Sequence, residues 1–253
     1  MQNNLTVTPL SLFFAASLVL IAIFISLKQH LSLEKDLVIS VIRAIIQLTI
    51  VGYLLTYIIK VNNAIFTVVM VLLIIFNASW NAAKRSKKVK NAFWISFISI
   101  FISTSVTMSL LVISGSIKFI PAQMITVSGM VASNSMVAAG LCFRNMYSNF
   151  RDQRQQVMEK LALGADLKQS SISIIRESIK TGMAPTIDSA KTVGIVSLPG
   201  MMSGLIFAGI DPTKAIMYQI MVAFMLLSAT GLSSISICYL SYKSYFNKDL
   251  QLI

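Results

Sequence analysis

Residues 197–204 read Ser-Leu-Pro-Gly-Met-Met-Ser-Gly, and they closely follow a charged stretch that runs from Arg144 to Lys191. Apolar sequence lies on both sides of this stretch. Over the whole chain, 56% of the residues are hydrophobic and only 12% are charged, with a mean hydropathy of +0.78. Soluble domains are far less apolar than this. The sequence therefore predicts an all-α membrane protein that crosses the bilayer repeatedly and carries one large polar loop.

Seven apolar runs flank the charged stretch and are long enough to cross a membrane. A helix that spans the hydrocarbon core, about 30 Å thick, needs roughly 20 mostly apolar residues. The predicted spans cover residues 9–27, 37–59, 64–81, 92–113, 120–143, 192–210 and 212–242, with a cytosolic loop at 144–191. These runs leave no room for a soluble domain, so residues 1–253 are interpreted as a single transmembrane permease domain.

Lys and Arg residues are distributed unevenly between the two sides of the predicted membrane. Seventeen of the 21 fall on one side, including eight within Arg144–Lys191. Short loops rich in these residues stay in the cytoplasm. We therefore expect a multi-pass protein of the plasma membrane with its N-terminus outside and its C-terminus in the cytoplasm. The net charge of +12 then reflects topology and attraction to the lipid bilayer, and we expect no binding of nucleic acid.

The sequence offers little catalytic chemistry within the membrane. All nine acidic residues lie in predicted loops or at the ends of spans, and His30 is the sole histidine. Catalysis in the membrane would need a carboxylate pair, a Ser/His couple or a metal site, and ion-coupled transporters usually relay charge through intramembrane acids. We therefore expect a transport subunit that is not an enzyme. Cys142 and Cys238 lie near cytoplasmic ends of spans, where thiols stay reduced, so no disulfide is expected.

The cytosolic loop is expected to be helical, with an interruption at Gly164. Four apolar residues then recur at spacings of three and four: Ile172, Ile175, Ile179 and Met183. This spacing indicates an amphipathic helix. The helix either rests against the membrane interface or the bundle, or serves as a coupling helix that a cytosolic ATPase grips. We expect it to break at residues 182–185, Gly-Met-Ala-Pro, close to the start of the sixth predicted span.

Several stretches carry a family resemblance that spans nearly the whole chain. The most specific is Val196–Gly204, which leads to Gly209–Pro212. The others are Arg43-Ala44 with Gln47-Leu48, Gly52–Leu55, Gly129-Met130 with Asn134 and Met136, Leu161–Ala165, and Ala184–Ser189. In these stretches the sequence closely resembles the FetB family of ABC-transporter permeases. The family consists of bacterial proteins linked to iron export, and its plant relatives are linked to aluminium tolerance.

The resemblance implies that this chain works with partners. Two copies of the permease would combine with two cytosolic ABC ATPase subunits, and ATP and Mg²⁺ would bind to the ATPase, so this chain would bind no cofactor. Part of the cytosolic loop also resembles the Glu-Ala-Ala motif by which importer permeases dock their ATPases, although its glycine follows the glutamate by five residues rather than six. The predicted ATPase-coupling residues are Glu159, Leu161, Ala162, Leu163, Gly164, Ala165 and Asp166.

Polar residues inside the predicted spans are candidates for a transport pathway. Arg43 and Gln47 are four residues apart and share one helical face. Arg43 either faces protein or water, where it could bind an anion, or reaches toward the cytoplasmic interface. Asn134 lies near the middle of the fifth span, where polar residues either pack helices or line a pathway. Pro199-Gly200 would allow a kink or an unwound turn, whose free carbonyl groups could bind a cation.

Methionines in spans five, six and seven add a second possible chemistry. Thioethers bind soft metals such as Cu(I), whereas methionine also fills irregular gaps in protein cores. Both interpretations remain open, and no metal ligand is assigned. The candidate pathway and hinge residues are Arg43, Gln47, Asn134, Pro199, Gly200, Met201 and Met202.

The residues and the resemblance together predict the permease subunit of an ABC transporter that exports iron or a related metal. The predicted spans hold no His, Asp or Glu that could bind a bare metal ion. Two alternatives therefore stay open. One is an ABC permease for an organic anion such as a nucleotide sugar, and the other is a channel or secondary transporter that works without an ATPase.

Overall fold

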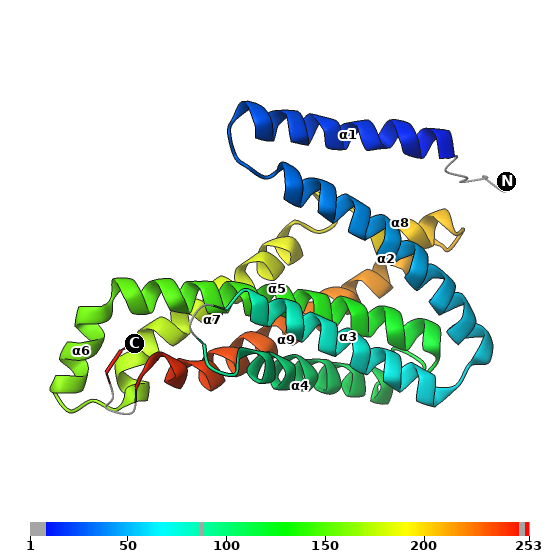
Figure 1. Ribbon diagram of the computed structural model, residues 1–253. Coiled ribbons are helices and arrows are strands. Elements are labelled where there is room, and N and C mark those ends of the chain that lie inside the picture. The colour runs from blue at the N-terminus through cyan, green and yellow to red at the C-terminus, as the bar shows by residue number, and fades with distance from the viewer. Residues whose placement is uncertain (1–8, 87–88, 248–250, 253) are drawn as a thin grey trace. The chain divides into compact units, whose positions relative to one another are not determined.

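The computed structural model describes residues 9–86, 89–247 and 251–252, and these residues form a series of α-helices joined by short loops (Figure 1). The all-α class is therefore confirmed. The chain divides into two compact units, Met1–Val61 and Asn62–Ile253, which are described separately. Four charged residues counted above lie outside the described residues: Lys87, Lys88, Lys248 and Asp249.

The N-terminal unit is a pair of apolar helices, α1 (Pro9–Lys28) and α2 (Glu34–Val61). The hydroxyl group of Ser26 ties the turn between them, because it donates to Glu34 Oε1 at 2.7 Å and accepts from the backbone N–H of Leu33 at 3.1 Å. Most of the large apolar side chains of both helices are exposed within this unit. Both helices are long and apolar enough to cross a membrane, so lipid or other protein must cover these faces.

The second unit is built around α5 (Pro121–Asp152), which packs against α3 (Ala64–Lys84), α4 (Ala92–Ile113) and α9 (Pro212–Ser241). These four helices lie side by side in Figure 1. With α1 and α2 they make six helices, among the residues that the structure describes, with the length and hydropathy of membrane spans. The protein is therefore a polytopic membrane protein.

Small hydroxyl side chains hold the centre of this bundle together. The hydroxyl groups of Ser103 on α4 and Ser135 on α5 lie 3.2 Å apart, and Ser233 on α9 donates to the backbone oxygen of Ser135, also at 3.2 Å. All three residues are completely buried. In a membrane, helices gain little from burying apolar surface against each other, so close approach over small residues and hydrogen bonds between helices contribute most of the attraction.

Helices α5 and α9 run in the same direction along the bundle. Late residues of α5 meet late residues of the C-terminal segment: the rings of Phe150 and Tyr245 stack with centroids 4.6 Å apart, and Ser241 Oγ lies 3.4 Å from Met146 Sδ. The chain must therefore travel back along the bundle between the end of α5 and the start of α9. Helix α7 (Leu167–Thr192), which packs against both α5 and α9, makes most of this return.

The predicted sixth span at residues 192–210 is wrong in its position. Helix α7 ends at Thr192, the backbone is not helical from Val193 to Pro199, and α8 (Gly200–Phe207) has only 8 residues. At 1.5 Å per residue, α8 is about 12 Å long and cannot cross the hydrocarbon core alone. Gly194 and Gly209 lie near the two ends of the predicted span, residues 192–210. Both have positive φ, which favours turns over a continuous helix. The unwound backbone expected next to Gly200 is present.

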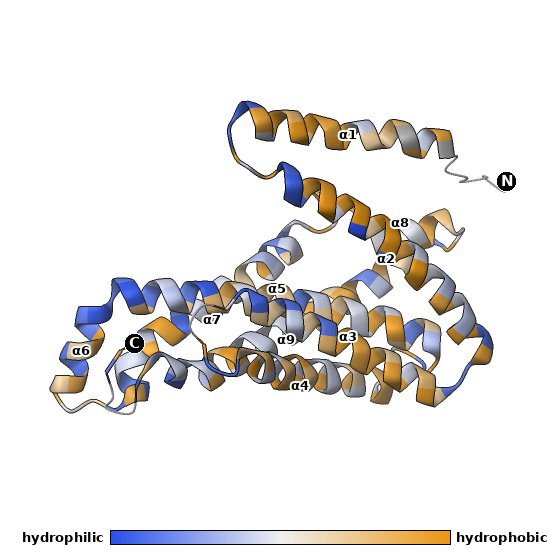
Figure 2. Cartoon of the chain, in the orientation of Figure 1, coloured by the Kyte–Doolittle hydropathy of each residue, from blue (hydrophilic) through white to orange (hydrophobic). Residues whose placement is uncertain are grey.

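The predicted loop at residues 144–191 is almost entirely helical. Helix α5 continues nine residues beyond its predicted end at residue 143, and α6 (Arg154–Ala162) and α7 follow. With 32 residues α5 is about 48 Å long, so it extends well beyond a hydrocarbon core of about 30 Å. Figure 2 shows hydrophilic residues gathered on α6 and on the adjoining end of α5.

The break expected at residues 182–185 is absent, because α7 continues through Pro185 to Thr192. A proline inside a helix removes one backbone hydrogen bond and costs about 3 kcal/mol. The helix packs closely against its neighbours here: a Cβ atom at Gly182 would lie only 2.4 Å from Cys142 Sγ and 2.8 Å from Ser234 Oγ. The amphipathic helix itself is confirmed, but small residues such as Ser171, Ser178 and Gly182 are buried more deeply than Ile172, Ile179 and Met183.

Candidate functional site

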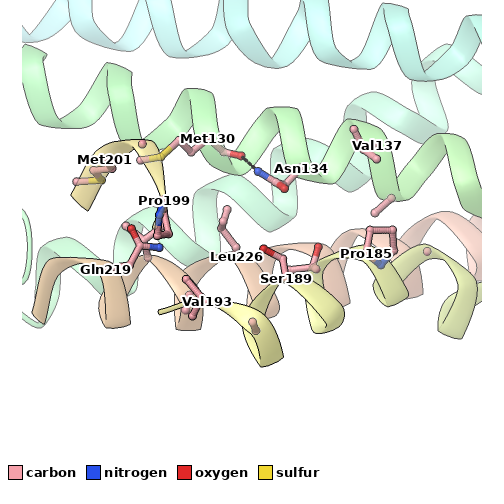
Figure 3. A pocket seen from close by; sticks show the side chains of 17 residues that line it. Met130, Asn134, Val137, Pro185, Ser189, Val193, Pro199, Met201, Gln219 and Leu226 are labelled. Carbon is pink, nitrogen blue, oxygen red and sulfur yellow. Dashed lines mark hydrogen bonds between the residues drawn. The ribbon is translucent and has the colours of Figure 1, made fainter. Parts of the chain in front are cut away.

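A cavity of about 290 Å³ lies inside the second unit, where α5, α7, α8 and α9 meet (Figure 3). The break between α7 and α8 creates this space, because it replaces a continuous helix by a loop and a short helical turn. The lining residues are Met130, Asn134, Val137, Ala138, Gly182, Pro185, Thr186, Ser189, Ala190, Val193, Pro199, Gly200, Met201, Gln219, Val222, Ala223 and Leu226.

Two amides from different helices provide the most polar groups of the cavity. Asn134 Nδ2 on α5 donates to the backbone oxygen of Met130 at 2.9 Å, which fixes the amide and leaves its carbonyl oxygen as an acceptor. Gln219 comes from α9, on the other side of the cavity in Figure 3. Its Oε1 atom is shielded from solvent and has no hydrogen-bond partner among the described residues. A buried, unsatisfied acceptor costs about 1–3 kcal/mol, so a bound donor or cation would stabilise this side chain.

The remaining polar and sulfur-containing side chains come from α5, α7 and the start of α8. Thr186 and Ser189 offer hydroxyl groups, and Met201 and Met130 offer thioether sulfurs. None of the described residues that line the cavity is charged or a histidine, and the described part of the chain holds no cluster of three or more His, Cys, Asp or Glu side chains. The lining side chains can therefore bind a solute only through neutral groups: hydroxyls, amides and thioether sulfurs.

The structure brings together four of the seven predicted pathway residues: Asn134, Pro199, Gly200 and Met201 line the cavity. Met202 is partly buried on α8 but is not among the lining residues. Arg43 and Gln47 lie on α2 in the N-terminal unit, where both are exposed.

Sequence reasoning missed Gln219 and the contribution of α7. Gln219 is the only residue with a side-chain amide among the 30 residues of α9. A single amide in an apolar run is a signal that could have identified it as a candidate site residue. Thr186 and Ser189 fall within the predicted cytosolic loop, because α7 is too polar for hydropathy to indicate a membrane helix. Its polar residues are tolerated because the helix packs against α5 and α9.

The predicted coupling residues form a rigid corner between α6 and α7. Gly164 has a φ of 91°, and the backbone N–H groups of Gly164 and Ala165 donate to the carbonyl groups of Leu161 and Lys160, both at 3.0 Å. This is a Schellman motif, which closes a helix end. Asp166 then caps α7 through a reciprocal pair of hydrogen bonds with Gln169.

Side chains of this corner differ in exposure. Leu161 packs against the main hydrophobic core of the second unit, whereas Leu163 is 88% exposed at the tip of the corner. Glu159, Ala162, Gly164 and Asp166 are also exposed. An exposed leucine on a rigid, otherwise polar corner fits a recess on a protein partner better than it fits water.

A second corner of the same design joins α8 to α9. The N–H groups of Gly209 and Ile210 donate to Ile206 and Leu205, both at 3.0 Å, and Asp211 caps α9 by accepting from Thr213. Hydrogen bonds from the Thr213 hydroxyl and backbone lower the pKa of the Asp211 carboxyl below its ordinary value. The carboxylate is therefore ionised at neutral pH, and it caps the start of α9.

A family description, the uncharacterised protein family UPF0014, matches residues 9–246. The probable iron export permease protein FetB of Escherichia coli (strain K12) is 56% identical over 252 residues, covering 100% of this chain and 97% of the relative. UPF0014 membrane protein YjkA of Bacillus subtilis (strain 168) is 37% identical over 96% of this chain and 97% of the relative.

A plant protein is also similar. Protein ALUMINUM SENSITIVE 3 of Arabidopsis thaliana is 35% identical over 94% of this chain and 87% of its own length. No solved structure matches the chain. The resemblance drawn from the motifs above is confirmed, and the chain belongs to the UPF0014 family of membrane proteins.

Proposed function

We propose that this chain is the permease subunit of an ABC transporter that exports iron or a related metal. The observation that carries the proposal is the neutral cavity at the break between α7 and α8, inside a bundle of membrane helices. The name of the E. coli relative, an iron export permease, supports the cargo. Transport requires a site that binds cargo inside the membrane and then releases it, and weak neutral ligands meet both needs.

The break in the helix gives the cavity a way to change shape. Interrupted helices at the centre of a membrane bundle are typical of transport sites, because their free backbone groups face cargo and their ends can move separately. Pro199 and Gly200, at the start of α8, are the proposed hinge. Asn134, Met201 and Gln219 are the proposed cargo contacts, and movement of α7 against α8 would open or close the cavity around them.

The corner between α6 and α7 is the proposed docking site for a cytosolic ABC ATPase. Leu163 would enter a recess on the ATPase, and Glu159 and the flanking residues would surround it. Because α7 runs without a break from this corner to the cavity, a displacement of the corner by the ATPase would be transmitted along one rigid helix. The helix thus reaches the cavity without the break that the sequence predicted at residues 182–185.

The remaining partners follow from this role. ATP and Mg²⁺ would bind to the ATPase, two permeases would pair with two ATPases, and the docking corner would lie in the cytoplasm. Basic side chains near that end of the bundle support this orientation in a plasma membrane, with the N-terminus outside: Arg144, Arg151, Arg154, Lys160 and Lys168.

The test is ATP hydrolysis by the permease reconstituted in liposomes with the proposed ABC ATPase partner. Iron, manganese, zinc, copper and a nucleotide sugar are compared as cargo. We expect the metal that is transported to stimulate hydrolysis severalfold. Stimulation by the nucleotide sugar alone would replace the metal by an organic anion, and transport without any bound ATPase would favour the independent channel or secondary transporter.

A further inference from the structure

Two arginines from different parts of the chain lie against the same glycine of α5. Arg85 directly follows α3, and its Cδ and Nη1 atoms lie 2.7 and 3.3 Å from the position that a Cβ atom would take at Gly140. Arg144, one helical turn beyond Gly140, donates from Nε to the backbone oxygen of Gly140 at 3.4 Å. Gly140 is buried, whereas both arginines are exposed. Two guanidinium groups therefore share one small area of the surface.

No carboxylate among the described residues neutralises these two arginines. Three ion pairs are found in the described part of the chain, and none includes Arg85 or Arg144. Asp152 lies about two turns beyond Arg144 on α5. Its carboxylate pairs instead with Arg151 at 2.9 Å and accepts from Ser148 Oγ at 3.0 Å. Two adjacent positive charges without a carboxylate favour an anionic ligand.

The lengths of two helices place this pair of arginines at a boundary of the hydrocarbon core. Helix α3, with 21 residues, is about 32 Å long and ends at Lys84, next to Arg85. At 1.5 Å per residue, Gly140 lies about 30 Å along α5 from its start at Pro121. Both lengths match a hydrocarbon core of about 30 Å. The guanidinium groups therefore lie at the level of the lipid headgroups.

Both tryptophans of the chain mark the same boundary. Trp80, one turn before the end of α3, is 50% exposed, and Trp94, in the first turn of α4, is 61% exposed. Their rings contact Phe93 edge to face, with centroids 5.9 and 5.5 Å apart. Lys84 Nζ lies 5.6 Å from the centroid of the Trp80 ring. Exposed tryptophan beside basic residues is typical of the headgroup region, so this end of the bundle meets lipid phosphates.

We propose that Arg85 and Arg144 bind the phosphate group of an anionic phospholipid. The planar fork of N–H donors on a guanidinium group matches the oxygens of a phosphate, and basic groups between helices at the headgroup level bind anionic lipids. A free phosphate ion offers the same oxygens. A lipid is favoured because its acyl chains hold the phosphate at the depth where these arginines lie. The proposal depends neither on the transported cargo nor on the ATPase.

The test is native mass spectrometry of the complete permease in detergent, without the ATPase. The protein is titrated with phosphatidylglycerol or with phosphatidylcholine of the same acyl chains. We expect one phosphatidylglycerol per chain to bind more tightly than phosphatidylcholine. Arg85→Gln and Arg144→Gln should each weaken this binding about fivefold. Arg151→Gln is the matched control, because it removes the same charge from an arginine that is already paired with Asp152. It should bind like the unmodified protein.

A second pair of variants separates the geometry of the site from its charge. Gly140→Ala keeps both arginines but adds a methyl group where the Arg85 side chain lies, so it should displace that side chain and weaken phosphatidylglycerol binding severalfold. Gly129→Ala, on the same helix, is the matched control, because nothing lies within 4 Å of its Cβ position. It should leave lipid binding unchanged. Elution volume and thermal unfolding establish that each variant is folded.

Four results would overturn the proposal. Unchanged lipid binding in both Arg85→Gln and Arg144→Gln would remove the site, and an equal loss in Arg151→Gln would reduce it to general attraction between charges. Displacement of the lipid by excess inorganic phosphate at constant ionic strength would make it a site for the free ion. Loss of ATPase co-purification in the two glutamine variants, with unchanged lipid binding, would assign the surface to the ATPase. None of these results would contradict transport through the cavity, whose proposed cargo contacts lie elsewhere.

Discussion

Asn134 and Ser133 are neighbours on α5 that use the same backbone acceptor with different consequences. Both side chains donate to the carbonyl oxygen of Met130, at 2.9 and 3.2 Å, but only Asn134 lines the cavity. We expect Asn134→Leu to reduce cargo affinity about fivefold, the equivalent of one neutral hydrogen bond of about 1 kcal/mol. Ser133→Ala should leave affinity unchanged. Metal-stimulated ATP hydrolysis at several cargo concentrations measures both, and equal effects would assign Asn134 to helix packing.

A different outcome is expected for Gln219, because its Oε1 atom is buried and has no hydrogen-bond partner among the residues that the structure describes. Gln219→Leu removes that unsatisfied acceptor, so we expect equal or higher thermal stability together with slower transport. Met217→Leu, on the exposed face of the same helix, is the control and should change neither. Thermal unfolding in detergent and metal efflux from liposomes provide the two readouts. Lower stability with normal efflux would show that Gln219 serves the fold alone.

At the scale of elements, the apolar helices were predictable from the sequence, whereas the contribution of α7 to the cavity was not. The bounds of α4 are those expected from hydropathy, residues 92–113. Helix α7 was not recognised as a bundle helix, because its buried face consists largely of serine and glycine. Hydropathy detects contact with lipid, whereas α7 packs against protein on α5 and α9. Where helices approach each other closely, as at Gly182, the only sign of this packing in the sequence is a glycine.

The corner between α6 and α7 gives a prediction at this scale. Leu163→Ser should lower co-purification with the ATPase severalfold and leave the permease folded, because a side chain that is 88% exposed contributes little to the core. Ile195→Ser is the matched control, since Ile195 is also 88% exposed but lies between α7 and α8. It should retain the ATPase. Loss of the ATPase in both variants, or in neither, would contradict docking at Leu163.

For the whole molecule, the direction of the helices decides how many times the chain crosses the membrane. Six long helices alone would return the C-terminus to the side of the N-terminus. Helices α5 and α9 run in the same direction, however, so the segment between them must cross back. We propose that helix α7, the loop that follows it and α8 together form this crossing, with the cavity at their break. On this proposal the transport site lies where a seventh crossing is built from two pieces.

This composite crossing predicts that the two termini face opposite sides of the membrane. A reporter active only in the cytoplasm, fused after the C-terminus, should be active, and the same reporter fused before the N-terminus should be silent. Fusion within the corner at Gly164 should be active, and fusion at Gly209, between α8 and α9, should be silent. Activity at both Gly164 and Gly209 would mean that α7 and α8 do not cross, and the cavity could then no longer connect the two sides of the membrane.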